Sequence, residues 1–185
     1  MEQEYKDYLN SRSKLAKFYR NFYLYPKLER NLIYPCIDIG CGIGDFLKFS
    51  QKTVFGVDIN NHLVDQCQKE GLKVELISNY KIPSNDAAYN AAILDNVLEH
   101  ISDPKLTLQE TYRILRPNAK LIIGVPGVKG YASDNDHQIY YDDQNIIPLL
   151  NKYSFSFEKK IIMPLPLKYL TNILKIYCTY YVFRK

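Results

Sequence analysis

The residues that could do chemistry begin with an apolar run that ends in an acid and three alternating glycines. This stretch reads Cys36-Ile-Asp-Ile-Gly-Cys-Gly-Ile-Gly44, so the acid is Asp38. Glycine has no Cβ atom, so glycines here permit a tight turn and let a ligand approach the backbone closely. A second acid, Asp58, ends the next apolar run and follows Gly40 by 18 positions. A spacing of roughly 20 residues is typical of a carboxylate that binds ribose hydroxyls, so the pattern predicts a nucleoside ligand.

The spacing of the glycines separates two classes of nucleoside ligand. A dinucleotide-binding turn has the pattern G-x-G-x-x-G, or a final Ala, which lets a helix start tightly against the pyrophosphate. Counted from Gly40, that last position is Asp45, whose carboxylate would lie near a phosphate. An NAD-dependent oxidoreductase is therefore the less favoured alternative. The G-x-G-x-G spacing after Asp38 instead resembles motif I of the class I S-adenosylmethionine-dependent methyltransferases, whose cofactor carries no phosphate.

The resemblance extends over most of the chain. Residues 89–104 are similar to the fourth-strand region of small methyltransferases of the ubiquinone/menaquinone type, and residues 115–126 are similar to their fifth-strand region. Residues 136–155 resemble the stretch that follows in the same group. The similarity covers roughly residues 35–160, and a last strand is expected at 178–184.

Three asparagines depart from the family pattern. Asn79 stands where the family usually has an aspartate that accepts a hydrogen bond from the adenine amino group, and an asparagine carbonyl can still accept one. Asn90 replaces the usual aspartate before the fourth strand. Asn118 replaces a turn glycine, and asparagine tolerates the left-handed backbone region better than most residues. The first two replacements keep open a non-catalytic, cofactor-binding regulatory subunit as the alternative function.

The resemblance implies a role for each residue of the site. The glycine turn and the first acid would hold the methionine part of S-adenosylmethionine, the second acid would bind the ribose, and residues after the second and third strands would border adenine. The acid that ends the fourth strand and its neighbour would face the transferred methyl group, and S-adenosylhomocysteine would be the product. The implied cofactor-binding residues are Asp38, Gly40, Gly42, Gly44, Asp58, Ile59, Asn79, Tyr80, Asp95 and Asn96.

Candidate catalytic groups are fewer. Methyl transfer needs a proton acceptor only when the nucleophile is a hydroxyl or a similar group near neutral pH. His137, in a polar loop after the fifth strand, is the favoured base or substrate contact, and Asp95 is the second catalytic candidate. The alternative for His137 is a surface histidine that caps a turn, and His100 is expected to make a structural hydrogen bond. The four cysteines lack the spacing of a metal site, so no metal is expected.

Alternation of apolar runs and amphipathic stretches predicts the fold class. The pattern favours an α/β, Rossmann-like, doubly wound sheet of seven strands, covered on both faces. By resemblance, the sheet is mostly parallel with a reversed last strand. The expected strands cover residues 35–39, 53–58, 73–77, 90–95, 119–125, 155–162 and 178–184, and the expected helices cover residues 4–23, 43–50, 61–70, 104–115, 142–152 and 165–175.

The two ends of the chain carry amphipathic stretches. Residues 1–30 are expected to form a helical cap on the methyltransferase domain of residues 31–185, within the same domain. Its aromatic face includes Tyr5, Tyr8, Leu9, Phe18 and Phe22, with charges expected outside, Arg20 among them. The cap either simply packs on the domain or lids the cofactor and shapes the acceptor pocket. The stretch 165–177 is expected to cover the core or a dimer interface, and the sharper alternative is a membrane-surface contact for a lipid-linked acceptor.

Composition and missing motifs narrow the acceptor and the location. The chain has 185 residues, 46% hydrophobic content and a net charge of +4, which suits one core and gives little reason to expect a nucleic-acid partner. The Pro-Pro-Tyr motif of base methylation and the double-glutamate loop of arginine methylation are both missing. We therefore expect a small-molecule, sugar or lipid-linked acceptor. We also expect a cytoplasmic protein, as a monomer or a homodimer, because no apolar run reaches the roughly 18 residues that a membrane span needs.

Overall fold

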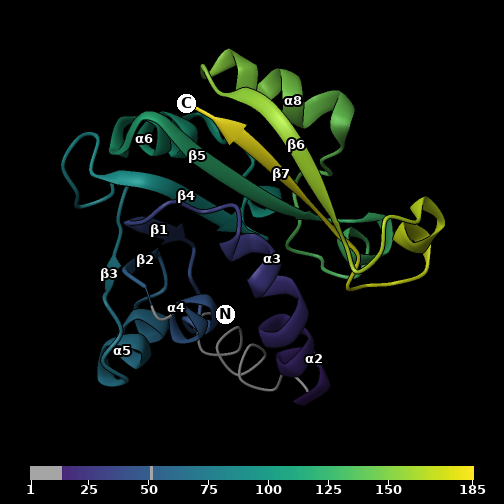
Figure 1. Ribbon diagram of the computed structural model, residues 1–185, viewed down its shortest axis with the longest axis horizontal. Coiled ribbons are helices and arrows are strands. Elements are labelled where there is room, and N and C mark those ends of the chain that lie inside the picture. The colour runs from purple at the N-terminus through teal and green to yellow at the C-terminus, as the bar shows by residue number, and fades with distance from the viewer. Residues whose placement is uncertain (1–13, 51) are drawn as a thin grey trace.

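Seven strands form one mixed sheet in the order β3-β2-β1-β4-β5-β7-β6 (Figure 1). The computed structural model describes residues 14–50 and 52–185. Strands β1 to β5 run parallel to one another, and β7 runs antiparallel to both β5 and β6. The predicted fold class and the reversed last strand are therefore confirmed. The strands are β1 (Cys36–Ile39), β2 (Val54–Asp58), β3 (Val74–Leu76), β4 (Tyr89–Asp95), β5 (Leu115–Pro126), β6 (Ser156–Met163) and β7 (Cys178–Arg184).

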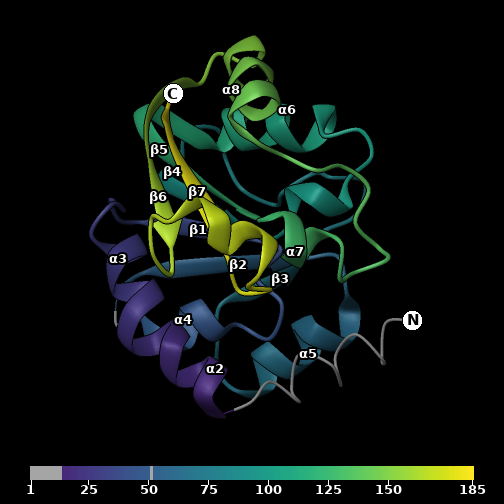
Figure 2. The same ribbon diagram turned by 90° about the vertical axis from the view of Figure 1, so that its right-hand side faces the viewer.

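Helices cover both faces of this sheet. Figure 2 shows α6 and α8 above the sheet, with α3, α4 and α5 below it. The central strands read as apolar runs because successive side chains enter opposite cores: Ala92 and Leu94 of β4 pack on one side, Ala91 and Ile93 on the other. The longer helices are α5 (Asn61–Lys69), α6 (Lys105–Ile114) and α8 (Asp143–Lys152), and the short ones are α4 (Asp45–Phe49), α7 (Val128–Tyr131), η2 (Leu98–His100) and η3 (Lys168–Asn172).

The N-terminal helical segment packs into the same core as the sheet. Its described part consists of α2 (Lys14–Tyr19), a π-helical turn η1 (Arg20–Leu24) and α3 (Tyr25–Glu29). Tyr25 is buried, and its ring centroid lies 5.3 Å from that of Phe46 on α4. The helical segment thus extends past residue 23, where the predicted helix ended, to Glu29. The predicted aromatic positions Tyr5, Tyr8 and Leu9 lie outside the described residues.

The stretch predicted as a helix over 165–175 differs from the expectation. It forms only the 3₁₀-helix η3, which lies beside α7. Thr171 explains the docking, because its hydroxyl accepts a hydrogen bond from the Val128 N–H at 2.9 Å and its side chain lies against Gly127. The close approach of Thr171 to Gly127 and Val128 favours a tight turn. Apolar side chains of the segment, such as Ile173, are exposed at the surface. The short helix α7 was not predicted from the sequence.

Strand β5 begins four residues before the predicted boundary. It starts at Leu115, and Asn118 within it adopts a left-handed φ of 64°. That conformation fits the expectation that asparagine can replace a glycine in this turn.

Among residues 14–50 and 52–185, no helix combines the length and the apolar character that a membrane-spanning helix requires.

Candidate active site

The glycine turn follows β1 in a backbone conformation that favours glycine. Gly40, Gly42 and Gly44 have φ values of 75°, 57° and 72°, in the left-handed region. A Cβ atom on Gly40 would lie 2.6 Å from Cγ2 of Val97, so a larger residue would also collide. The N–H of Gly40 donates to the carbonyl of Val57 at 2.8 Å. The turn is thereby fastened to the end of β2, beside Asp58.

Asp58 is fixed against this turn by backbone hydrogen bonds. Its Oδ2 accepts from the N–H of Gly42 at 2.8 Å, and its Oδ1 accepts from the N–H of Asn60 at 2.9 Å. Burial raises the pKa of Asp58, while these N–H groups hold it down. The Ile59 N–H is a third backbone donor. A carboxylate has about four acceptor positions, so about one remains for a ligand hydroxyl. The next residue, Ile59, is 71% exposed and presents an apolar surface that a flat ring could cover.

Asp38 is a buried carboxyl between the two cores. It is only 4% exposed, and burial, followed by the negative charge of Asp95, raises the pKa of Asp38 well above its ordinary value. Arg20 opposes this shift. A buried acid of this kind is stabilised as a carboxylate when a cation comes close. The environment of Asp38 therefore suits an ammonium or sulfonium group.

Asn79 and Tyr80 form a turn at the same edge of the sheet. Both residues are left-handed, with φ values of 53° and 61°, and both are exposed. The N–H of Ile77 donates to the carbonyl of Asp58 at 2.9 Å, which ties this segment to the end of β2. The structure therefore brings the turn near Asp58, with its two side chains accessible to a ligand.

Asp95, at the carboxyl end of β4, is held by three side-chain donors. Its Oδ2 lies 2.6 Å from Nη2 of Arg20, and its Oδ1 accepts from the hydroxyl of Tyr180 at 2.8 Å and from Nδ2 of Asn96 at 2.9 Å. The side chain is only 12% exposed. Asn96 in turn has a left-handed φ of 57° and accepts a weak hydrogen bond from the Cys178 thiol. This arrangement makes Asp95 a fixed anion rather than a mobile proton acceptor.

Two of these partners were missed by the sequence interpretation. Arg20 was placed among solvated charges, but its side chain is 21% exposed and turns inward to Asp95 and to the Tyr25 hydroxyl, which accepts from Nε at 2.8 Å. The π-helical turn shifts the helical register, so no periodic pattern could have indicated this direction. Tyr180 had an indirect signal in Gly124, because a glycine inside a strand marks a close approach. A Cβ on Gly124 would lie 2.4 Å from the Tyr180 ring.

His137 lies in the loop between α7 and α8, next to a second histidine. Its Nδ1 is 2.8 Å from the carbonyl oxygen of Tyr131, on whose ring it stacks. The ring centroid of His100 is 4.6 Å away, and Oε1 of Glu99 lies 4.0 Å from His137 Nε2. The side chain of His137 is 7% exposed, so it is not the surface histidine considered from the sequence. The structure groups it with Glu99 and His100, and it shows no contact with Asp95 among the described residues.

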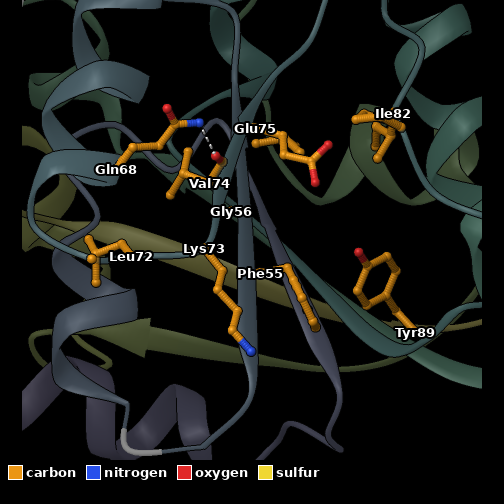
Figure 3. A pocket seen from close by; sticks show the side chains of 12 residues that line it. Phe55, Gly56, Gln68, Leu72, Lys73, Val74, Glu75, Ile82 and Tyr89 are labelled. Carbon is orange, nitrogen blue, oxygen red and sulfur yellow. Dashed lines mark hydrogen bonds between the residues drawn. The ribbon is translucent and has the colours of Figure 1, made fainter.

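Two surface hollows lie near the sheet, and neither contains Asp38, Asp58 or Asp95. The hollow in Figure 3 has a volume of about 620 Å³ and lies along β2 and β3. Gln68 closes one side of it by donating to the Val74 carbonyl at 2.8 Å (dashed in Figure 3). The second hollow, about 420 Å³, is lined by residues that include Arg20 and Ile43, so it reaches both the N-terminal segment and the glycine turn.

These residues fit the chemistry of the cofactor that the sequence resemblance implies. The left-handed glycine turn offers backbone without side chains, Asp38 offers a buried carboxyl that a cation would stabilise, and Asp58 offers a free acceptor position beside an exposed apolar residue. A nucleoside that carries ammonium and sulfonium groups, and no phosphate, matches this set. A pyrophosphate would instead meet Asp45 at the start of α4.

Comparison with known proteins supports this assignment. Residues 37–123 match the family described as methyltransferase domain. An uncharacterized 37.1 kDa protein of a Streptomyces fradiae transposon is 33% identical over 101 residues, which are 49% of this chain and 29% of that protein. A 2-phytyl-1,4-naphtoquinone methyltransferase of a Nostoc species is 26% identical over 143 residues, which are 70% of this chain and 62% of that enzyme. The chain thus spans less than two thirds of the length of both relatives.

A solved structure covers the whole chain. A methyltransferase from Thermotoga maritima, described as a possible histamine N-methyltransferase, superposes with a TM-score of 0.75 at 18% identity, over 100% of both chains. At this identity the likeness shows the fold. Together with the methyltransferase-domain match over residues 37–123, it identifies the fold as that of an S-adenosylmethionine-dependent methyltransferase.

Proposed function

We propose that this protein is an active methyltransferase that acts on a small apolar or lipid-linked acceptor. The observation that carries the proposal is a set of exposed apolar side chains on the two segments that flank the Asp95 end of β4. One segment is the N-terminal helical segment, and the other is the connection between β6 and β7. The Tyr23 hydroxyl donates to the Pro164 carbonyl at 3.0 Å and joins the two. The exposed residues are Leu15, Phe18, Phe22, Leu165, Leu167, Tyr169, Ile173 and Ile176.

We assign cofactor binding to the edge formed by β1, β2 and β3. Asp38 would neutralise the ammonium group of the methionine part, and the backbone at Gly40, Gly42 and Gly44 would line it. Asp58 would accept a hydrogen bond from a ribose hydroxyl at the position that its backbone bonds leave free. S-adenosylmethionine, when bound, supplies an electrophilic methyl group on a positively charged sulfur.

Adenine would lie between the side chains that follow β2 and β3. Ile59 and Tyr80 are exposed at this edge and offer an apolar and an aromatic surface. Asn79 can accept a hydrogen bond through its side-chain carbonyl in place of the usual aspartate. These assignments use the same residues that the sequence interpretation proposed.

The protein's own contribution to transfer is positioning and exclusion of water. Arg20 and Tyr180 hold Asp95, and Asn96 lies beside it, so the end of β4 keeps one geometry. Alignment of a bound nucleophile with the methyl group is the main source of rate in such a reaction. Asp95 contributes as a fixed negative charge near the sulfonium, and Arg20 prevents that charge from being buried alone.

The acceptor class follows from the apolar surface. Phe18 and Phe22 stack with ring centroids 4.4 Å apart and are 58% and 70% exposed. Large apolar side chains gathered at a surface mark binding sites more often than isolated ones do. The Nostoc relative is named for a phytyl naphthoquinone, an acceptor of this chemical kind. We further propose that the described part of the N-terminal segment, residues 14–30, forms a cap within the same domain, because Leu24, Tyr25 and Leu28 share a core with the sheet.

An acceptor assay tests the proposal. The formation of S-adenosylhomocysteine is measured with an apolar quinol, a sugar and a polar amine as acceptors. We expect turnover with the quinol only, and we expect Phe22→Asp to lower that rate without changing cofactor affinity. Leu106→Asp is the matched control, because Leu106 is also an exposed apolar residue but lies on α6, across the sheet. Turnover of the sugar or amine alone would contradict the acceptor class, and bound cofactor with no turnover would favour a regulatory subunit.

Membrane contact is tested separately. Sedimentation with anionic liposomes separates a lipid-linked acceptor from a freely dissolved one. We expect salt-sensitive binding that Ile173→Asp weakens, because Ile173 is 60% exposed on the apolar connection. Equal sedimentation with and without liposomes would remove the lipid-linked acceptor from the proposal.

A further inference from the structure

Three side chains that can bind metal ions meet outside the proposed cofactor site. Glu99 and His100 lie on η2, just after β4, and His137 lies in the loop between α7 and α8. The backbone ties the two segments together, because the N–H of Gln138 donates to the carbonyl of Glu99 at 2.7 Å. One ligand atom from each of the three side chains lies within 4.8 Å of the others.

Glu99 is the least expected member of this group. It is 0% exposed, and neither of its carboxyl oxygens has a hydrogen-bond partner among the described residues. Buried polar groups without a partner are rare in native proteins and call for a specific explanation, such as an ion. Oε1 of Glu99 lies 4.0 Å from Nε2 of His137.

His137 has the hydrogen-bond pattern of a metal-binding histidine. A carbonyl oxygen only accepts, so the 2.8 Å contact with Tyr131 places a hydrogen on Nδ1 and leaves a lone pair on Nε2. Histidine ligands usually donate their other ring N–H to a carbonyl or carboxylate in this way. Nε2 lies 4.0 Å from Oε1 of Glu99 and 3.9 Å from Oδ2 of Asp134. Both distances are too long for a hydrogen bond and leave room for an ion.

His100 completes the donor set. Its ring centroid lies 4.6 Å from that of His137. A hydrogen bond between its ring and the backbone of Asp136 orients it. The second carboxylate, Asp134, is partly exposed beside the group and adds negative charge.

We propose that Glu99, His100 and His137 bind a divalent transition-metal ion, with Zn²⁺ as the ion of choice. Two imidazoles and one carboxylate form a donor set that is typical of zinc sites with an open position. In a tetrahedral zinc site, ligand atoms lie about 3.4 Å apart, so these side chains need to close by about 1 Å. A bound ion would join the end of β4 to the loop before α8, and Asp134 stands near the open position.

Metal binding to the full-length protein tests the proposal without any assay of methyl transfer. The protein, free of affinity tags and stripped by a chelator, is titrated with Zn²⁺ by calorimetry and with Co²⁺ by visible absorption. We expect one equivalent of each ion to bind, with micromolar or tighter affinity. Glu99→Gln and His137→Ala are each expected to weaken binding at least about 100-fold and to abolish the visible Co²⁺ bands.

His62 provides the matched control. It is the third histidine of the chain, and it is exposed on α5, away from the group. His62→Ala should bind both ions like the unaltered protein. Glu99→Gln removes the buried charge and keeps the shape, so its fold can be checked by circular dichroism before titration. Binding that survives in Glu99→Gln and His137→Ala, or no binding of either ion at millimolar concentration, would overturn the proposal.

Discussion

The two halves of the proposed active site are built in different ways. In the cofactor half, the contacts link neighbouring parts of the chain: Asp58 accepts from Gly42, 16 residues away, and from Asn60, two residues away. In the transfer half, Asp95 is held by Arg20, 75 residues away, and by Tyr180, 85 residues away. Local contacts form within one βαβ unit, whereas the distant ones depend on how both chain ends return to the sheet.

The two halves therefore have different functions, and they depend on different parts of the chain. The cofactor half uses backbone N–H groups and glycines, so its shape follows directly from the β1–turn–β2 geometry. The transfer half uses side chains from the N-terminal segment and the last strand, which are the parts of the fold outside the matched family region of residues 37–123. We infer that cofactor binding is set by the first half, and that the second half adapts the domain to its own acceptor.

The largest expected effect comes from removing the ribose-binding acid. Asp58→Ala should weaken S-adenosylmethionine binding by about 100-fold, because a charge-assisted hydrogen bond to the ligand and the anchor of the glycine turn are lost together. Calorimetric titration measures the change. Asp65→Ala on the exposed side of α5 is the matched control and should leave affinity unchanged. If Asp58→Ala bound S-adenosylmethionine as tightly as the unaltered protein, the assignment of cofactor binding to the first half would be wrong.

The next effect concerns Arg20. Arg20→Ala should lower kcat about 30-fold and reduce the free energy of unfolding by about 2 kcal/mol, because Asp95 then keeps a largely buried charge without its cation. The cofactor dissociation constant should change less than kcat does. Steady-state kinetics and urea unfolding provide the two numbers, with the exposed Lys17→Ala as control. A loss of affinity with kcat preserved would move Arg20 into the cofactor half.

A smaller effect should appear in the pH dependence of cofactor binding. In the free protein the pKa of Asp38 is raised by burial and by Asp95, and a bound ammonium would favour its carboxylate. Binding therefore releases a proton, so affinity is greatest above the free-protein pKa and falls as the pH drops through it, by up to about tenfold per pH unit. Titrations over about pH 5 to 8 measure the slope. Asp38→Asn should flatten it, and an unchanged slope in that variant would assign the proton to another group.

The smallest effect is expected at Tyr180. Tyr180→Phe keeps the ring that packs over Gly124 and removes one hydrogen bond to Asp95. We expect a loss of about 1 kcal/mol in stability and about a fivefold lower kcat. Thermal unfolding and steady-state kinetics measure the two changes, and Tyr112→Phe at an exposed position on α6 is the control. A larger effect than that of Arg20→Ala would reverse the order of importance in the transfer half.

The sequence predicted the positions of the strands, where the signal was local. Three left-handed glycines and an acid at the end of β2 could be recognised from spacing, and Asn118 does occupy a left-handed turn. The partners of Asp95 could not, because the direction of Arg20 depends on a π-helical turn and on packing against Tyr25. The helix predicted over residues 165–175 was wrong for the same reason. The hydroxyl of Thr171 accepts a hydrogen bond from the N–H of Val128 on α7, and a helical periodicity in the sequence does not indicate such a long-range contact.

The group around His137 shows a further limit of sequence interpretation. Glu99 and His100 are adjacent to each other but separated by more than 35 residues from His137, and their meeting depends on the loop between α7 and α8. Metal-site recognition from sequence relies on short regular spacings, which this group lacks. The expectation of no metal rested on the spacing of the cysteines alone. The group of Glu99, His100 and His137 is instead a metal site that we propose and that can be tested.

One measurement tests the central claim that the β1–β3 edge binds S-adenosylmethionine. The purified protein is titrated in parallel with S-adenosylmethionine, S-adenosylhomocysteine and NAD in the calorimeter. We predict micromolar binding of the first two and no measurable binding of NAD, because Asp45 opposes a pyrophosphate and Asp38 favours a cation. Binding of NAD with no binding of the two sulfur nucleosides would contradict the account.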